Sequence, residues 1–110
     1  VLTYWINHGT NPRGARYAYI VRPTDSEPAP RLNILANTPK LQAAATDDLA
    51  ALAFHVAGAI KTRTFGEVST AQPALVLLRR TGLREAELSV ADPTTKLEMP
   101  ELRVGGKKID

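Results

Sequence analysis

The residues best suited to acid–base chemistry stand together near the start of the chain. Tyr4, Asn7 and His8 share one short segment, and such side chains abstract a proton or stabilise the charge that develops on the substrate. A His-Gly pair between strands, however, more often marks a turn in which the imidazole bonds a neighbouring carbonyl. We therefore expect a structural role for His8 and assign no catalytic residue.

Metal and nucleophile chemistry finds little support elsewhere. Asp47, Asp48 and His55 do not make a metal site, because no second histidine or suitably spaced carboxylate completes a set of three ligands. We expect His55 to lie at an edge or to be partly buried. No serine occupies a Gly-x-Ser-x-Gly elbow, and cysteine is absent. The Gly105-Gly106 pair precedes lysines in an order unlike a phosphate loop, which indicates a tail turn. The sequence predicts no metal and no cofactor.

Binding of an anionic partner is a further chemical possibility. Guanidinium groups bind carboxylate and sulfate groups well, and the candidate residues are Arg79, Arg80 and Arg84. The alternative for these arginines is the solvated end of a strand. Trp5, Tyr17 and Tyr19 could stack on a ring-shaped ligand, but burial in a core is the more ordinary fate of aromatic side chains.

Composition places the chain among small globular domains. It has 110 residues, 44% of them hydrophobic and 23% charged, which is too apolar for a disordered chain. No run approaches the roughly 20 apolar residues of a membrane span. The net charge of +3 is spread over both halves, so no basic face for nucleic acid is indicated. The sequence therefore predicts one domain or part of one, with no nucleic-acid or membrane partner.

The regular spacing of short strand patterns and turn residues is typical of an all-β protein. Alternating or continuous apolar runs predict strands at 17–21, 32–36, 73–78 and 87–91. Apolar residues also alternate around Pro100, with Leu97 and Met99 before it and Leu102 and Val104 after it. A proline-rich stretch after Val21 reads as an extended connector. Short strands separated by Gly, Pro and Asp turns are typical of a β-sandwich.

Residues 38–60 admit two interpretations. Thr38 as N-cap, Pro39 in the first turn and apolar residues at helical spacing favour an amphipathic helix. Alternatively, residues 46–48 form the turn of a hairpin whose strands span 41–45 and 49–55. Local propensity alone does not choose between these two structures.

Three segments together resemble the C-terminal part of polysaccharide lyase family 8. They are Trp5–Gly9 leading into Tyr17–Pro23, Ile34–Thr38 with Leu41–Ala43, and Leu88–Thr94. The family contains hyaluronate, chondroitin and xanthan lyases, in which a helical toroid precedes a central β-sandwich and a smaller terminal one. The resemblance implies an antiparallel β-sandwich at 32–110, preceded by a connector at 24–31 and by the last strands of the central sandwich at 1–23. It also implies strands over residues 38–60.

The resemblance carries functional implications as well. Family members cleave acidic polysaccharides by β-elimination outside the cell, with an Asn, His, Tyr and Arg set in the toroid. No position here matches that set, and the chain starts at Val1 without a leader, so we expect a non-catalytic portion of a secreted lyase. Its partners would be the toroid and central sandwich, with an acidic polysaccharide as a further one. An autonomous carbohydrate-binding sandwich is the alternative.

Overall fold

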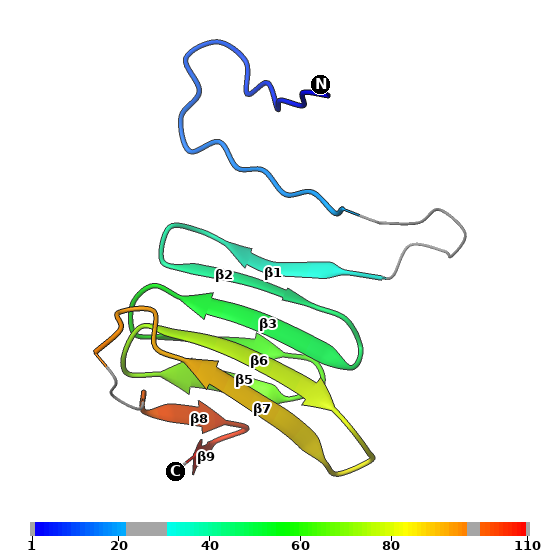
Figure 1. Ribbon diagram of the computed structural model, residues 1–110, viewed down its shortest axis with the longest axis vertical. Coiled ribbons are helices and arrows are strands. Elements are labelled where there is room, and N and C mark those ends of the chain that lie inside the picture. The colour runs from blue at the N-terminus through cyan, green and yellow to red at the C-terminus, as the bar shows by residue number, and fades with distance from the viewer. Residues whose placement is uncertain (1, 22–30, 97–99, 110) are drawn as a thin grey trace.

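The protein is an antiparallel β-sandwich. The computed structural model describes residues 2–21, 31–96 and 100–109. Within these residues there is no helix, and the strands form a five-stranded sheet, β1-β2-β3-β6-β7, and a four-stranded sheet, β4-β5-β8-β9. Figure 1 shows the two sheets as the two layers of one body, with residues 2–21 running apart from them. The predicted all-β fold class is confirmed.

The strands are short, as the spacing of turn residues predicts. Their bounds are β1 Asn33–Asn37, β2 Leu41–Ala45, β3 Leu49–Phe54, β4 Gly58–Thr62, β5 Gly66–Thr70, β6 Ala74–Arg80, β7 Ala86–Ala91, β8 Leu102–Val104 and β9 Lys107–Ile109.

Residues 38–60 adopt the strands that the resemblance implied. Strands β2 and β3 pair across the turn at 46–48, with Ala43 opposite Leu52, and β3 pairs on its other side with β6. Thr38 caps no helix: its Oγ1 accepts a hydrogen bond from the Leu41 backbone N–H at 3.0 Å and so holds the β1–β2 turn. The segment does not form a helix, because β3 makes backbone hydrogen bonds to a strand on each side and packs into the core there, and this pairing outweighs the local helix preference.

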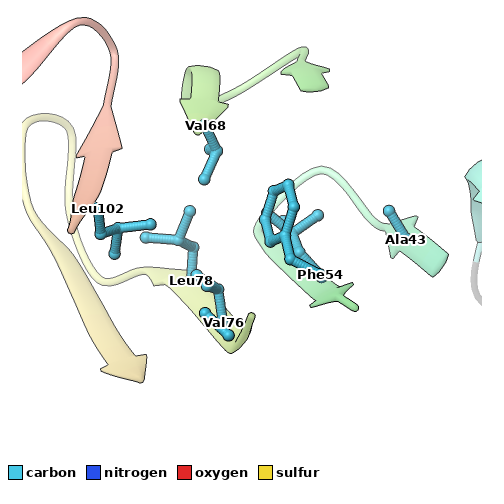
Figure 2. Close-up of a cluster of buried hydrophobic side chains, with 9 residues drawn as sticks. Ala43, Phe54, Val68, Val76, Leu78 and Leu102 are labelled. Atoms are coloured by element: carbon cyan, nitrogen blue, oxygen red, sulfur yellow. The ribbon is translucent and has the colours of Figure 1, made fainter. Parts of the chain in front are cut away.

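The core lies between the two sheets. Phe54 and Leu78 from the five-stranded sheet meet Val68 and Leu102 from the four-stranded sheet, and all four are at most 2% exposed (Figure 2). Every second residue of β3 and β6 points into this core, as the period of a strand requires. Strand β6, expected to be a buried strand, is therefore covered on one face only.

The buried polar side chains of the core are satisfied by local bonds. Thr62, at the end of β4, donates to the Gly66 carbonyl at 2.8 Å and accepts from the Phe65 N–H at 3.0 Å. Thr70 donates to the Gln72 carbonyl at 2.8 Å. These hydroxyls close the turns that follow β4 and β5, and no buried side-chain polar atom among the described residues lacks a hydrogen-bond partner.

The predicted strand at 17–21 is not formed. Among the described residues no segment pairs with it, and Trp5, Tyr17 and Tyr19 are 80%, 60% and 72% exposed, so the expectation that they are core residues is wrong for this chain. A strand needs a neighbour to satisfy its backbone groups and to cover one face, and none is supplied here. The connector residues 22–30 and the pair Leu97 and Met99 lie outside the described residues.

Three strands were missed by local patterns. Strands β4 and β5 form a hairpin whose alternation of apolar residues is weak, with Ile60 opposite Val68. The tail, read as a turn with solvated lysines, continues into β9, which pairs with β8. Gly105 and Gly106, with φ of 61° and 84°, make the two-residue connection because both of its positions need positive φ.

Candidate binding surface

The outward side of the five-stranded sheet is unusually apolar. Because side chains alternate along each strand, the residues between the buried positions form one outward surface. We call its two most apolar rows the outer face and define it as Ile34, Gln42, Ala44, Ala51, Ala53, Leu75, Leu77 and Ala91. The same side of the sheet also carries Leu49, Arg79, Glu87 and Ser89, which border the outer face. The pairing register places Ile34, Ala44, Ala51 and Leu77 in one row across four strands. Gln42, Ala53, Leu75 and Ala91 form the next row.

The outer face has small residues at its centre and larger ones around them. Alanines on β2 and β3 leave a shallow trough, while Ile34, Leu75 and Leu77 stand higher and are 53%, 44% and 42% exposed. Residues 14–18 approach the outer face near β1, and together they line an open hollow of about 770 Å³. The Asn37 side-chain amide donates to the Tyr17 carbonyl at 2.9 Å and ties this segment to β1.

The arginines predicted to meet an acidic polymer lie at one end of β6. Arg79 lies 3.4 Å from Glu87, and Arg80 lies 2.7 Å from Asp48, so both guanidinium groups already have an acidic partner. Arg79 and Arg80 are neighbours on a strand and point to opposite sides of the sheet. Arg84 is exposed in the β6–β7 turn. The structure thus brings the three to one end of the sheet without joining them on one surface.

The expected turn at His8 and Gly9 is present only in part, because the described residues around it form no strand. The Asn7 side chain, not the His8 imidazole, makes the closing bond, by accepting from the Gly9 N–H at 2.8 Å. The His8 ring instead lies 6.1 Å from that of Tyr17, and Tyr17 stacks with Tyr19 at 6.4 Å. The contacts described for these exposed rings join aromatic side chains to one another and assemble no acid–base pair.

The second histidine also lies on the surface. His55 is exposed at the end of β3, where its Nε2 lies 3.3 Å from the Gln42 amide oxygen. Within the described residues, no three His, Cys, Asp or Glu side chains come together in a group that could hold a metal ion. The described part also contains no helix long and apolar enough to cross a membrane.

The outer face was not predicted as a site, although the sequence carries a signal for it. The runs Ala74–Leu78 and Leu49–Phe54 are continuously apolar. Such runs are typical of strands covered on both faces, whereas a strand with one wet face alternates. The apolar side chains of the outer face therefore do not contribute to the sandwich core.

The described residues therefore form a small two-sheet antiparallel β-sandwich with an apolar outer face. The model for the polysaccharide lyase family 8 C-terminal β-sandwich domain matches residues 33–101. The chain belongs to polysaccharide lyase family 8, as the resemblance of its motifs indicated.

Two curated bacterial proteins are similar to the chain. Chondroitinase-AC of Pedobacter heparinus is 33% identical over 121 residues, which cover 96% of this chain and 17% of that enzyme. Xanthan lyase of a Bacillus species is 30% identical over 99 residues, which cover 84% of this chain and 10% of that enzyme. The chain thus spans less than a fifth of either relative. No solved structure matches it significantly.

Proposed function

We propose that this chain is the non-catalytic C-terminal portion of a secreted lyase that depolymerises an acidic polysaccharide by β-elimination. The observation that carries the proposal is the match of residues 33–101 to the terminal sandwich of the family, combined with the small share of each relative that the chain spans. Residues 1–23 are then the end of the preceding central sandwich and 24–31 the connector.

The chemistry of the described residues supports a scaffold role. β-Elimination needs a base near the proton beside a uronate carboxyl and a cation or polar cluster at the developing enolate. His8 lies beside an exposed tyrosine ring and His55 beside an amide, while Arg79 and Arg80 already pair with carboxylates. No such constellation is assembled among the described residues, which agrees with bond-breaking groups that belong to the helical toroid of the parent enzyme.

An ultraviolet assay tests this proposal. The 110-residue chain and the full polypeptide that its gene encodes are each incubated with hyaluronan, chondroitin sulfate and xanthan, and unsaturated uronic products are followed by absorbance. We expect product from the full polypeptide on one polymer and none from the 110-residue chain. Product from the purified short chain would overturn the scaffold role, and a gene without upstream lyase sequence would overturn membership in a larger enzyme.

A contact with the acidic polymer at Arg79, Arg80 and Arg84 is a further part of the proposal. Their side chains lie at one end of β6 and in the adjoining turn, and those of Arg79 and Arg80 are 61% and 46% exposed. A polymer would have to compete with Glu87 and Asp48 for them. Calorimetry with chondroitin sulfate tests the contact: we expect weak heat that the Arg79→Ala/Arg80→Ala variant loses and Arg103→Ala keeps. No heat from the unaltered chain would remove the contact.

A further inference from the structure

We infer that the outer face of the five-stranded sheet is the surface on which this sandwich docks against the preceding part of the same lyase polypeptide. The inference rests on the proposed function, because its partner is the upstream β-domain of that enzyme. It adds which of the two sheets makes the contact and with which residues. The four-stranded sheet is left facing solvent.

Burial along the strands gives the first argument. In β6 the core-facing residues Val76 and Leu78 are at most 3% exposed, while Leu75 and Leu77 between them are 44% and 42% exposed. A strand with water on one side places polar residues there, as β5 does with Glu67 and Ser69. Leucines at the outward positions of β6 are therefore positions that another surface covers.

The size of the outer face agrees with an interdomain contact. Strands stand about 4.8 Å apart, so the four strands of a row span roughly 15 Å, and the outward rows lie about 7 Å apart along each strand. Allowing for side chains, the surface is on the order of 300 to 400 Å², which is one partner's share of an interface of about 600 to 1,500 Å² between domains of one chain. It is about the size of the largest apolar patch on a typical monomeric protein, a patch that is often functional.

The shape and charge of the surface favour an apolar β-sheet as the occupant. The two central rows carry no charge, and on the same side of the sheet Ser89 and the Arg79–Glu87 pair lie at their border. Interface cores are depleted of charge in the same way. The alanine trough accepts large side chains, which suits sheet-on-sheet packing at about 10 Å.

The segment before the sandwich indicates that the upstream domain is the occupant of the outer face. Residues 2–21, which the proposed function assigns to that domain, expose large apolar side chains: Leu2, Tyr4, Trp5, Ile6, Tyr17, Tyr19, Ile20 and Val21. Residues 14–18 of this segment line the same open hollow as the trough, and the Tyr17 carbonyl accepts a hydrogen bond from Asn37 of β1. The segment that leads into the upstream domain therefore arrives at the outer face, and Figure 1 shows it on the β1 side of the five-stranded sheet.

Thiol labelling tests the inference, because the chain has no cysteine of its own. Ala51→Cys places a thiol in the middle of the outer face, and Ala59→Cys places one on β4 of the other sheet, where the residue is also exposed. Each variant is made in the 110-residue chain and in the full polypeptide, and labelling is followed by mass spectrometry of the peptide. We expect Ala51→Cys to react at least about tenfold more slowly in the full polypeptide, and Ala59→Cys to react equally in both.

The outcomes separate this inference from the proposed function. If the full polypeptide degrades its polymer but Ala51→Cys reacts as fast as in the short chain, the docking inference fails and the proposed function stands. If the short chain protects Ala51→Cys only at high concentration, the occupant is a second copy and the inference fails. A gene that encodes no upstream lyase domain overturns both.

A second pair of variants measures the strength of the contact. Leu77→Glu adds a charge to the outer face, and Val56→Glu adds one in the β3–β4 connection at a residue that is 44% exposed, close to the 42% of Leu77. In the full polypeptide, Leu77→Glu should speed labelling of the Ala51→Cys thiol severalfold, and Val56→Glu should not. Equal labelling in the two variants would contradict the inference.

Discussion

Phe54 is the largest side chain that is fully buried in this small core. It is 1% exposed at the end of β3 and lies between the two sheets (Figure 2). Its ring touches residues that the sequence distributes over several strands, so the sandwich depends on it more than on any exposed aromatic residue. By contrast, Trp5 and Tyr19, equally prominent in the sequence, are exposed.

We expect Phe54→Ala to lower the free energy of unfolding by about 3 to 5 kcal/mol, because the deletion leaves a cavity that the sheets cannot fill by collapse. Urea unfolding followed by circular dichroism measures the change. If the variant does not fold, Phe54→Leu, with an expected cost of about 1 kcal/mol, provides the measurement. Tyr19→Ala is the control, and it should change stability by less than about 0.5 kcal/mol because the ring is exposed. Equal losses at both positions would contradict the core assignment.

At the scale of elements, the β8–β9 hairpin depends on its two glycines. Gly106 has a φ of 84°, and a Cβ added there would meet nothing within 4 Å, so any penalty comes from the backbone alone. Leu102, which closes one end of the core, is held by this hairpin.

Gly106→Ala should therefore destabilise the chain by about 1 to 2 kcal/mol through backbone strain. Gly82→Ala is the matched control, since its φ is not positive and its added Cβ would make only ordinary contacts at 3.8 Å. It should be neutral or slightly stabilising, because alanine restricts the unfolded chain. Urea midpoints compare the two variants, and similar midpoints would argue against the positive φ of Gly106.

Residues 38–60 show how pairing overrides local preference. The alanines and leucines of this segment fit a helix by propensity, and they form β2 and β3 because β1 and β6 pair on either side. A peptide of residues 38–60 loses both neighbouring strands and keeps only its local preferences.

This peptide should show a helical circular dichroism spectrum in trifluoroethanol, whereas the 110-residue chain in buffer should show a strand spectrum. A scrambled peptide that moves Thr38, Pro39 and the apolar residues off helical spacing is the control, and it should be less helical. A helix-dominated spectrum of the whole chain would show that the sandwich is wrong.

At the scale of the molecule, the sandwich and the segment before it are energetically separate. Among the described residues, the buried core contains none of residues 2–21, and an exposed hydrogen bond from Asn37 to Tyr17 ties that segment to β1. Such a bond contributes about 0.5 to 1.5 kcal/mol at most. The strands that form the core all lie after residue 32.

A chain of residues 32–110 should thus unfold cooperatively, with a free energy within about 1.5 kcal/mol of the 110-residue chain. Urea unfolding by fluorescence and circular dichroism measures this difference. A chain ending at residue 101 is the control, and it should fail to fold because it lacks β8 and Leu102. Loss of cooperative unfolding in 32–110 would mean that residues 2–21 belong to the core.

The sequence by itself determined the fold class, the family and most strands of the five-stranded sheet. Turn residues such as Thr38 and Gly82 and the alternation in Glu87–Ala91 are local, so they can be read without knowing any neighbour. The order of the three motifs indicated the family, and the family resemblance favoured strands over a helix at residues 38–60. The weakly patterned β4 and β5 and the glycine-linked β9 could not be found in this way.

Only the tertiary structure decided which apolar residues face the core. Tyr17 and Tyr19 alternate as a strand should, yet they remain exposed because this chain supplies no neighbouring strand. Leu75 and Val76 are adjacent and similarly apolar, yet one faces outward and the other lies in the core, since the pairing register sets which side each occupies. Burial depends on what lies across the sheet, and residues distant in the sequence provide that.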